Sequence, residues 1–306
     1  MRTIRIGTRQ SALALTQTKW VIRKLKEQFP ELTVETKPIV TKGDRIVEVT
    51  LSKIGGKGLF VKEIEQALLN GEIDVAVHSM KDLPGEMAEG LALAAVTKRE
   101  DPRDCLISRD GQTLRELPEG AVVGTSSLRR QAQVLAFRPD LKVKPVRGNI
   151  DTRLRKMREG AFDAIVLAGA GLRRMGWQHL ITEYLGTDVM LPAVGQGALG
   201  IQCRQDDDEL FALLQTLNDS VTSRAVTGER AFLHRLNGNC QVPIGAYATV
   251  EGDSVSLTGL VADPNAEQVY RQSSVGDNPE RLGVHLAERV SEMGAARILE
   301  ALRKEA

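Results

Sequence analysis

One cysteine in this sequence occupies a position that suits chemistry better than packing. Cys240 lies in "RLNGNCQVPIGAY" (residues 235–247), directly after Asn237, Gly238 and Asn239, which are residue types that favour turns. Structural cysteines usually lie inside apolar segments, whereas a thiol on a polar loop is accessible for reaction. A thiol protease would need an oriented base, and nothing in the sequence orients His234, which precedes Cys240 by six residues.

An acid with a comparable position is Asp82, in "AVHSMKDLPGEM" (residues 76–87). It follows a predicted strand, and Pro84 prevents a helix from continuing there. Open α/β sheets bind ligands at the carboxyl ends of their strands, so Asp82 is a candidate catalytic carboxylate with Lys81 beside it. The alternative is an aspartate that only caps a turn.

Arginines are concentrated in the middle of the chain. From Arg129 to Arg174 there are nine arginines and three lysines against four acids, although the net charge of the whole chain is only +1. Arg129 and Arg130, in "GTSSLRRQAQ", fall in the first turn of a predicted helix, where positive charge is unfavourable unless an anion lies nearby. Because the guanidinium fork suits two-point contacts with carboxylates and phosphates, the pattern predicts a ligand with several anionic groups. A solvated basic face is the alternative. Other candidates for anion contacts at predicted strand and helix ends are Arg9, Ser11, Arg147, Arg153 and Arg174.

A glycine-lysine segment, "TLSKIGGKGLFVKE" (residues 50–63), resembles a phosphate cradle. It does not match the P-loop pattern, because Lys57 is not followed by Ser or Thr and the glycines have the wrong spacing. We expect a lid that carries Lys53 and Lys57; a plain loop is the alternative.

The elements that position these residues occur twice. "TIRIGTRQSALALTQTKWVIRKL" and "GAVVGTSSLRRQAQVLAF" each predict a strand, a Gly-Thr turn and a helix that begins near Ser11 or Ser127. Each is followed by a strand, a second helix and another strand, which predicts βαβ units. We therefore predict an α/β fold of two duplicated βαβ lobes, resembling a periplasmic-binding-protein-like two-lobed fold, with the ligand between the lobes. Three short strand candidates and a long helix from about Pro279 predict a small α+β domain at the C-terminus.

This pattern suggests domain boundaries. The first lobe is expected to comprise residues 1–98 with 194–216, because the glycine-rich segment "DVMLPAVGQGALGIQCR" is expected to return the chain to it. The second lobe would comprise residues 99–193, and the C-terminal domain, with the Cys240 loop, residues 217–306.

Composition excludes several classes of protein. The small net charge disfavours a nucleic-acid binder, and no segment approaches the about 20 apolar residues of a membrane span. The three cysteines, Cys105, Cys203 and Cys240, form no metal pattern or disulfide framework, and the start lacks a signal peptide. These features predict a soluble protein of the reducing cytoplasm, with no metal site.

Motifs in this order resemble one family, porphobilinogen deaminase, also called hydroxymethylbilane synthase. The resemblance extends from residue 4 to about residue 250. The matching segments are "IGTRQSALALTQ", "KGDR", "GGKGLFVKE", "DVAVHSMKDLP", "REDPRDCLIS", "GTSSLRRQAQ", "RGNIDTRLRK", "LAGAGLRRMG", "LPAVGQGALGIQCR" and "ER…LNGNCQVPIGAYA".

The resemblance implies a transferase of tetrapyrrole and haem biosynthesis. Such an enzyme joins four porphobilinogen units head to tail, releases ammonia at each step, and frees the linear product hydroxymethylbilane for uroporphyrinogen III synthase. Its primer is a dipyrromethane cofactor attached by a thioether to the loop cysteine, here Cys240. The family is typically monomeric. It usually has Gly, Ser or Ala before that cysteine, and the Asn239 of this chain is the non-glycine residue type that best tolerates a positive φ.

The resemblance also implies residue roles. Asp82 would be the catalytic carboxylate and would contact the cofactor. The carboxylates of the cofactor would be held by Ser79, Lys81, Thr125, Ser127, Arg129, Arg130 and Arg147. The incoming substrate would be held by Arg9, Ser11, Arg153, Arg174 and Gln196, with Arg147 assigned to both sets.

Two other functions are compatible with parts of the pattern. A two-lobed binding protein or sensor for an organic polyanion would explain the duplication and the arginines, but it leaves Asp82 and Cys240 without roles. A phosphate-binding regulatory module would rest on the glycine-lysine segment alone.

Overall fold

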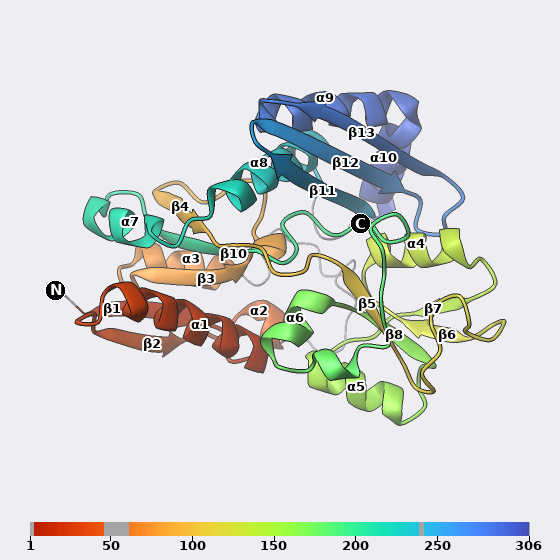
Figure 1. Ribbon diagram of the computed structural model, residues 1–306, viewed down its shortest axis with the longest axis horizontal. Helices are drawn as coiled ribbons and strands as arrows, with labels where there is room; N and C mark the ends of the chain where they lie inside the picture. The colour runs from red at the N-terminus through yellow and green to blue at the C-terminus, as the bar shows by residue number, and fades with distance from the viewer. Residues whose placement is uncertain (1–2, 46–60, 239–241, 306) are drawn as a thin grey trace.

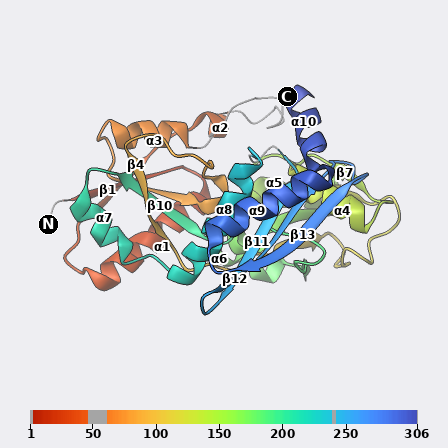
Figure 2. The ribbon, with the colours of Figure 1, turned by 90° about the horizontal axis from the view of Figure 1, so that it is seen from above.

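The computed structural model describes residues 3–45, 61–238 and 242–305, which form three units, each built on its own sheet (Figure 1). We call these units the first lobe, the second lobe and the C-terminal unit. Figure 2 shows the C-terminal helices α8 and α9 crossing the middle of the molecule, with the first lobe on one side and the second lobe on the other. The α-helices are α1 (Ala12–Gln28), α2 (Lys42–Arg45), α3 (Lys62–Leu69), α4 (Leu128–Phe137), α5 (Ile150–Arg158), α6 (Gly169–Arg174), α7 (Asp208–Gln215), α8 (Ser220–Arg235), α9 (Pro279–Val290) and α10 (Ala296–Glu305).

The sheet of the first lobe has the order β2-β1-β3-β10-β4. Its strands are β1 (Ile4–Thr8), β2 (Val34–Pro38), β3 (Val75–Ser79), β4 (Leu91–Val96) and β10 (Leu199–Arg204). β1 pairs in parallel with β2 and β3, while β10 runs antiparallel to both of its neighbours.

The sheet of the second lobe repeats this arrangement in the order β7-β6-β8-β5-β9. Its strands are β5 (Asp104–Ser108), β6 (Val122–Gly124), β7 (Lys142–Lys144), β8 (Ala164–Ala168) and β9 (Glu183–Tyr184). β6 pairs in parallel with β7 and β8, and β5 is antiparallel to β8 and β9. The predicted duplicated α/β fold is therefore confirmed, and each sheet also contains an antiparallel strand that the sequence pattern does not indicate.

Two segments, which we call crossing segments, lead the chain from one lobe to the other. Residues 97–103 connect β4 to β5, and residues 185–198 connect β9 to β10. The antiparallel strands β5 and β10 each begin where a crossing segment enters a lobe. Their direction is set by that entry rather than by a strand–helix–strand connection, so hydrophobic periodicity alone does not predict it.

Side-chain caps begin α1 of the first lobe and α8 of the C-terminal unit. The Ser11 Oγ accepts the Ala14 N–H (3.3 Å) at the start of α1. At the start of α8, Asp219 accepts the Thr222 N–H (2.8 Å). Each cap satisfies an amide that has no partner inside its helix, which fixes the residue at which the helix begins.

The C-terminal unit has the predicted strands as an antiparallel sheet, β11 (Ile244–Glu251), β12 (Ser254–Ala262) and β13 (Val269–Gly276). The predicted single long helix is interrupted. Gly294 has a φ of 127°, and a β-carbon there would collide with the ring of Tyr270, so α9 and α10 are separate helices.

Apolar contacts join this unit to both lobes. Val226 of α8 packs with Met80, Leu83 and Val96 of the first lobe, and Leu260 of β12 packs with α4 of the second lobe. None of the described helices is long and apolar enough to cross a membrane.

Candidate active site

A cleft of about 570 Å³ lies between the two lobes. Its lining comes from strand ends and helix starts of both lobes and from the crossing segment 185–198. Ten predicted site residues line it: Arg9, Ser11, Ser79, Lys81, Asp82, Arg130, Arg147, Arg153, Arg174 and Gln196. The structure thus brings these ten residues together where the two lobes face each other.

A smaller cavity of about 180 Å³ adjoins the cleft, since Lys81, Asp82 and several arginines line both. It also reaches Ser127 and Arg129 in the second lobe, and Leu233, Val242 and Ile244 of the C-terminal unit. Among the residues that the structure describes, Thr125 is the predicted site residue that lines neither cavity. It is buried, and its Oγ1 accepts the Ser127 N–H (3.2 Å).

Lys81 and Asp82 reach the cleft because of a short turn after β3. The chain leaves β3 at Ser79 and forms a 3₁₀ turn, η2 (Met80–Asp82). Met80 and Leu83 are buried in the core of the first lobe, so the two charged residues between them are turned toward the cleft, where they are half-buried.

Gln196 is placed by a glycine on each side. Gly195 and Gly197 have φ values of 70° and 95°, and a β-carbon on Gly195 would lie 2.7 Å from the Met80 side chain. The turn therefore packs directly on the start of η2. The Gln196 amide donates to the Pro102 carbonyl (2.7 Å), and its oxygen accepts from Lys81 Nζ (3.4 Å).

The cleft is strongly cationic. Among its described lining residues, six are arginine or lysine, and only Asp82 and Asp151 are acids. Burial, followed by the charges of Arg130 and Arg147, lowers the pKa of Arg153 to about 10. Burial and then Arg130 lower the pKa of Lys81 to about 8. Crowded, partly desolvated cations of this kind favour an anionic ligand.

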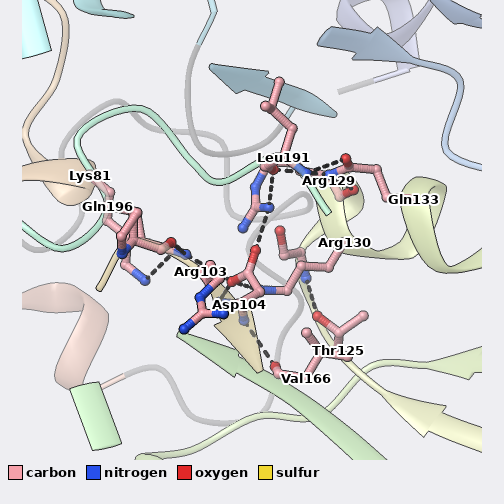
Figure 3. A network of polar contacts seen from close by, with 12 residues as sticks. Lys81, Arg103, Asp104, Thr125, Arg129, Arg130, Gln133, Val166, Leu191 and Gln196 are labelled. Atoms are coloured by element: carbon pink, nitrogen blue, oxygen red, sulfur yellow. Dashed lines mark hydrogen bonds and ion pairs between the residues drawn. The ribbon is translucent and has the colours of Figure 1, made fainter. Parts of the chain in front are cut away.

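The two arginines at the start of α4 meet a carboxylate of the protein itself (Figure 3). Asp104, the first residue of β5, is fully buried and contacts Arg129 Nη1 (2.6 Å) and Arg130 Nη2 (2.8 Å). Burial alone would raise the pKa of Asp104, but the charges of Arg129 and Arg130 outweigh it and hold that pKa below its usual range. The helix start therefore has the anion that the sequence pattern requires.

Asp104 is a residue that sequence reasoning missed. A signal was present, because Asp104 opens a strand that continues with the apolar residues Cys105, Leu106 and Ile107. An acid that is carried into a buried strand needs a cationic partner. The sequence does not show that this partner is the pair Arg129 and Arg130.

Backbone carbonyls orient two further arginines of the second lobe. Arg153 Nε donates to the Gly148 carbonyl (2.8 Å), and Arg174 Nη2 donates to the Gly197 carbonyl of the crossing segment (2.6 Å). In the first lobe, the Ser79 Oγ accepts from Gln17 Nε2 (3.0 Å). Ser11 uses its oxygen to cap α1, as described above.

The two described cysteines are unsuited to nucleophilic chemistry. Cys105 and Cys203 are fully buried in strands, and burial raises their pKa values to about 12 and about 11. Cys240 and the predicted lid residues Lys53 and Lys57 lie outside the described residues. Within the described ranges there is no group of His, Cys, Asp and Glu that could hold a metal ion.

The fold and the cleft define a two-lobed α/β protein with a cationic cleft between its lobes. Comparison with known families is more specific. Residues 4–212 match the family model described as "Porphobilinogen deaminase, dipyromethane cofactor binding domain", and residues 223–292 match the C-terminal domain of the same family. The chain belongs to the porphobilinogen deaminase family.

Curated relatives agree over the full length. The chain is 59% identical to the porphobilinogen deaminase of Halalkalibacterium halodurans, over 99% of this chain and 98% of the relative. It is 55% identical to that of Bacillus subtilis, over 100% of this chain and 98% of the relative. The predicted family, its role in tetrapyrrole biosynthesis and its dipyrromethane cofactor are confirmed.

Solved structures with lower identity are also similar. The BvgS VFT2 domain of Bordetella pertussis is 14% identical, with a TM-score of 0.45 over 75% of this chain and 92% of that chain. The periplasmic aliphatic sulphonate binding protein SsuA of Escherichia coli is 14% identical, with a TM-score of 0.43 over 78% of this chain and 71% of that chain.

Proposed function

We propose that the cleft between the lobes is where this chain joins four porphobilinogen units head to tail, with loss of ammonia at each step, to give hydroxymethylbilane. The observation that carries the proposal is the composition of the cleft, in which the half-buried carboxylate of Asp82 lies among six cationic side chains. Each pyrrole ring carries an acetate and a propionate, so the cations match the ring substituents. Asp82 matches the positive charge that develops on the ring.

The donor set of the cleft fits a dipyrromethane primer. Two linked rings carry four carboxylates, and bound carboxylates would offset the burial and the neighbouring positive charges that lower the pKa values of Arg153 and Lys81. We assign Ser79, Lys81, Ser127, Arg129, Arg130 and Arg147 to the carboxylates of the primer. Thr125 supports this set indirectly, because its Oγ1 accepts the Ser127 N–H and so holds Ser127 in place.

The substrate ring is assigned to Arg9, Ser11, Arg153, Arg174 and Gln196 of the larger cavity, with Arg147 shared between the subsites. Arg9, Ser11 and Arg174 line the larger cavity alone, whereas Arg147, Arg153 and Gln196 also line the smaller one. Gln196 contacts Lys81 on the side of the first lobe and the Pro102 carbonyl in the other crossing segment, so it lies where the lobes meet.

Asp82 is proposed as the catalytic carboxylate. When bound, the primer supplies a nucleophilic pyrrole α-carbon. Asp82 accepts hydrogen bonds from pyrrole N–H groups and stabilises the positive charge left on the substrate when ammonia departs. It also accepts a proton when ring aromaticity is restored.

Cys240 is proposed as the attachment point of the primer. The burial and raised pKa values of Cys105 and Cys203 leave Cys240 as the cysteine suited to form a thioether. The described residues on either side also support this assignment, because Leu233 and Val242 line the smaller cavity together with Asp82. Lys53 and Lys57 are proposed as lid residues on the basis of sequence alone.

We further propose that the chain acts as a monomer in the reducing cytoplasm and passes its product to uroporphyrinogen III synthase. The two described cysteines are free thiols, as is usual for proteins of a reducing compartment. We take the first lobe as residues 1–98 with 194–216, the second lobe as 99–193, and the C-terminal domain as 217–306.

An assay of the purified chain tests the function directly. Porphobilinogen should be consumed with release of one ammonia for each unit, and a linear tetrapyrrole should appear. Intact-protein mass should show a covalent increment of two pyrrole units. A bare chain that binds porphobilinogen without turnover would instead support a binding protein for organic polyanions.

A further inference from the structure

Asp104 lies behind the anion site rather than in it. Arg129 and Arg130 line the smaller cavity, and Arg130 also lines the cleft. Among the described lining residues of both cavities Asp104 does not occur, and its exposed fraction is 0%. The carboxylate therefore contacts the two guanidinium groups from the side of the protein interior. Figure 3 shows these contacts.

The contacts of Asp104 fix the orientation of both arginines. Its Oδ1 accepts from Arg130 Nε (3.0 Å) and Nη2 (2.8 Å), while its Oδ2 accepts from Arg129 Nη1 (2.6 Å). Two backbone carbonyls complete the arrangement, that of Val166 for Arg130 (3.0 Å) and that of Leu191 for Arg129 (2.6 Å). A guanidinium has more N–H donors than these contacts occupy, so both side chains keep donors for a ligand while their planes are held.

The same carboxylate is connected to the first lobe. Asp104 Oδ1 also accepts from Gln196 Nε2 (3.0 Å), and the Gln196 oxygen accepts from Lys81 Nζ (3.4 Å). Lys81 is adjacent to Asp82 in the chain. A continuous polar path therefore leads from the arginine pair of the second lobe to the residue beside the catalytic carboxylate.

Charge balance gives Asp104 a second effect. Two adjacent guanidinium groups repel each other, and one carboxylate between them compensates one of the two charges. The pair then keeps a net positive charge for a ligand without the full repulsion of two unpaired cations.

We propose that Asp104 is a positioning residue for the primer: it holds Arg129 and Arg130 in the orientation that receives primer carboxylates, and through Gln196 it aligns them with Lys81 and Asp82. This inference rests on the proposed function, because it takes the anion to be the primer. Asp104 itself does not touch the primer or the substrate.

The test is the isosteric variant Asp104→Asn, examined as the full chain. We expect a folded protein in which the primer is absent or substoichiometric by intact-protein mass. We also expect kcat per primed molecule to fall about 10-fold or more, with a smaller change in KM, because the primer rather than the substrate is misaligned. The matched control is Asp140→Asn, which breaks an aspartate–arginine pair with Arg138 (2.6 Å) in the same lobe. That control should keep full primer and a kcat within about two-fold of the parent.

A double variant separates a positioning role of Asp104, exerted through the arginines, from a purely structural one. If Asp104 acts through the arginines, adding Asp104→Asn to Arg130→Gln should lower primer occupancy and kcat by much less than the product of the two single effects. The double variant also avoids an excess of buried positive charge, so it serves if Asp104→Asn alone does not fold.

Two outcomes would overturn the inference: full primer with parental kcat in Asp104→Asn, or independent, multiplicative effects in the double variant. Failure of the proposed function looks different, because the unsubstituted chain would then carry no primer and would not consume porphobilinogen.

Discussion

Arg99 and Glu229 form a buried, two-point ion pair in which both Nη–Oε distances are 2.7 Å. Arg99 belongs to the crossing segment 97–103, and Glu229 belongs to α8 of the C-terminal unit. The Glu229 carboxylate also accepts the Gly195 N–H (2.7 Å) of the other crossing segment and the Ala248 N–H (2.9 Å) of β11. One carboxylate therefore joins both connections between the lobes to the unit that carries the cysteine loop.

This arrangement predicts a large loss of stability in Glu229→Gln. Glu229 is fully buried, so its neutralisation leaves the Arg99 charge uncompensated, at a cost of about 3–5 kcal/mol in the free energy of unfolding. Urea denaturation measures this free energy of unfolding. As a control, Glu288→Gln breaks the more exposed pair with Arg235 and should cost at most about 1 kcal/mol. Equal losses in the two variants would show that burial of Glu229 is not the source of the effect.

A second prediction concerns the catalytic carboxylate. Asp82→Asn keeps the shape of the side chain and removes its charge, so kcat should fall by about 10²–10⁴-fold while the primer remains attached. Single-turnover kinetics and intact-protein mass measure the two quantities separately. Asp151→Asn is the control, since it neutralises the other acid of the cleft lining and should change kcat by no more than about three-fold. A parental rate in Asp82→Asn would exclude this carboxylate from the chemistry.

A third prediction concerns the thiol anchor. Cys240→Ser should fold, carry no primer and be inactive, because a hydroxyl is a far weaker nucleophile than a thiolate. Cys105→Ala and Cys203→Ala remove thiols that are buried, so both should keep full primer. An acidic aldehyde reagent for pyrroles, together with intact-protein mass, measures the primer in all three. Primer in Cys240→Ser, or its loss in either control, would place the attachment elsewhere.

The sequence predicts the two lobes of the fold well, but it does not predict every contact of the candidate site. The repeated Gly-Thr turns and helix starts near Ser11 and Ser127 predicted the two lobes, because periodicity and capping are local properties. The direction of β5 and β10 was not predictable, since it depends on where the chain crosses between lobes. Asp104 was missed for a related reason: its pairing with Arg129 and Arg130 joins residues about 25 positions apart that only the folded second lobe brings together.

A fourth prediction concerns Lys81 and pH. In primer-free protein, such as the Cys240→Ser background, burial and Arg130 lower the pKa of Lys81 to about 8 from 10.5. Below pH 8 Lys81 is charged in both the folded and the unfolded state, and its burial lowers the free energy of unfolding by the full amount. Between pH 8 and 10.5 the folded state has lost the proton and the unfolded state still holds it, so this loss of stability shrinks as the pH rises. Lys81→Met should raise the Tm at pH 7, and the gain should shrink as the pH rises through that range.

Lys98→Met, at an exposed position, is the control for Lys81→Met and should change Tm little at any of these pH values. With Cys240 present, Lys81→Met should hold less primer, because the amine is then an anion ligand. A stabilising effect of Lys81→Met that grows with pH would contradict the assigned direction of the pKa.

The last prediction separates the primer subsite from the substrate subsite. Arg130 of α4 and Arg153 of α5 both line the cleft and the smaller cavity, and we assign the first to the primer and the second to the substrate. Arg130→Leu removes a primer ligand and also leaves the buried Asp104 carboxylate with one arginine, so the variant should be less stable and poorly primed. Arg153→Leu removes a substrate contact, and its Nε otherwise donates to a backbone carbonyl, so the primer should be present while KM rises and elongation slows. Mass spectrometry of both variants after a pulse of porphobilinogen measures primer content and elongation separately, because each added ring is a discrete increment on the chain. If Arg153→Leu were isolated without primer and Arg130→Leu were fully primed, the two subsites would have to be exchanged.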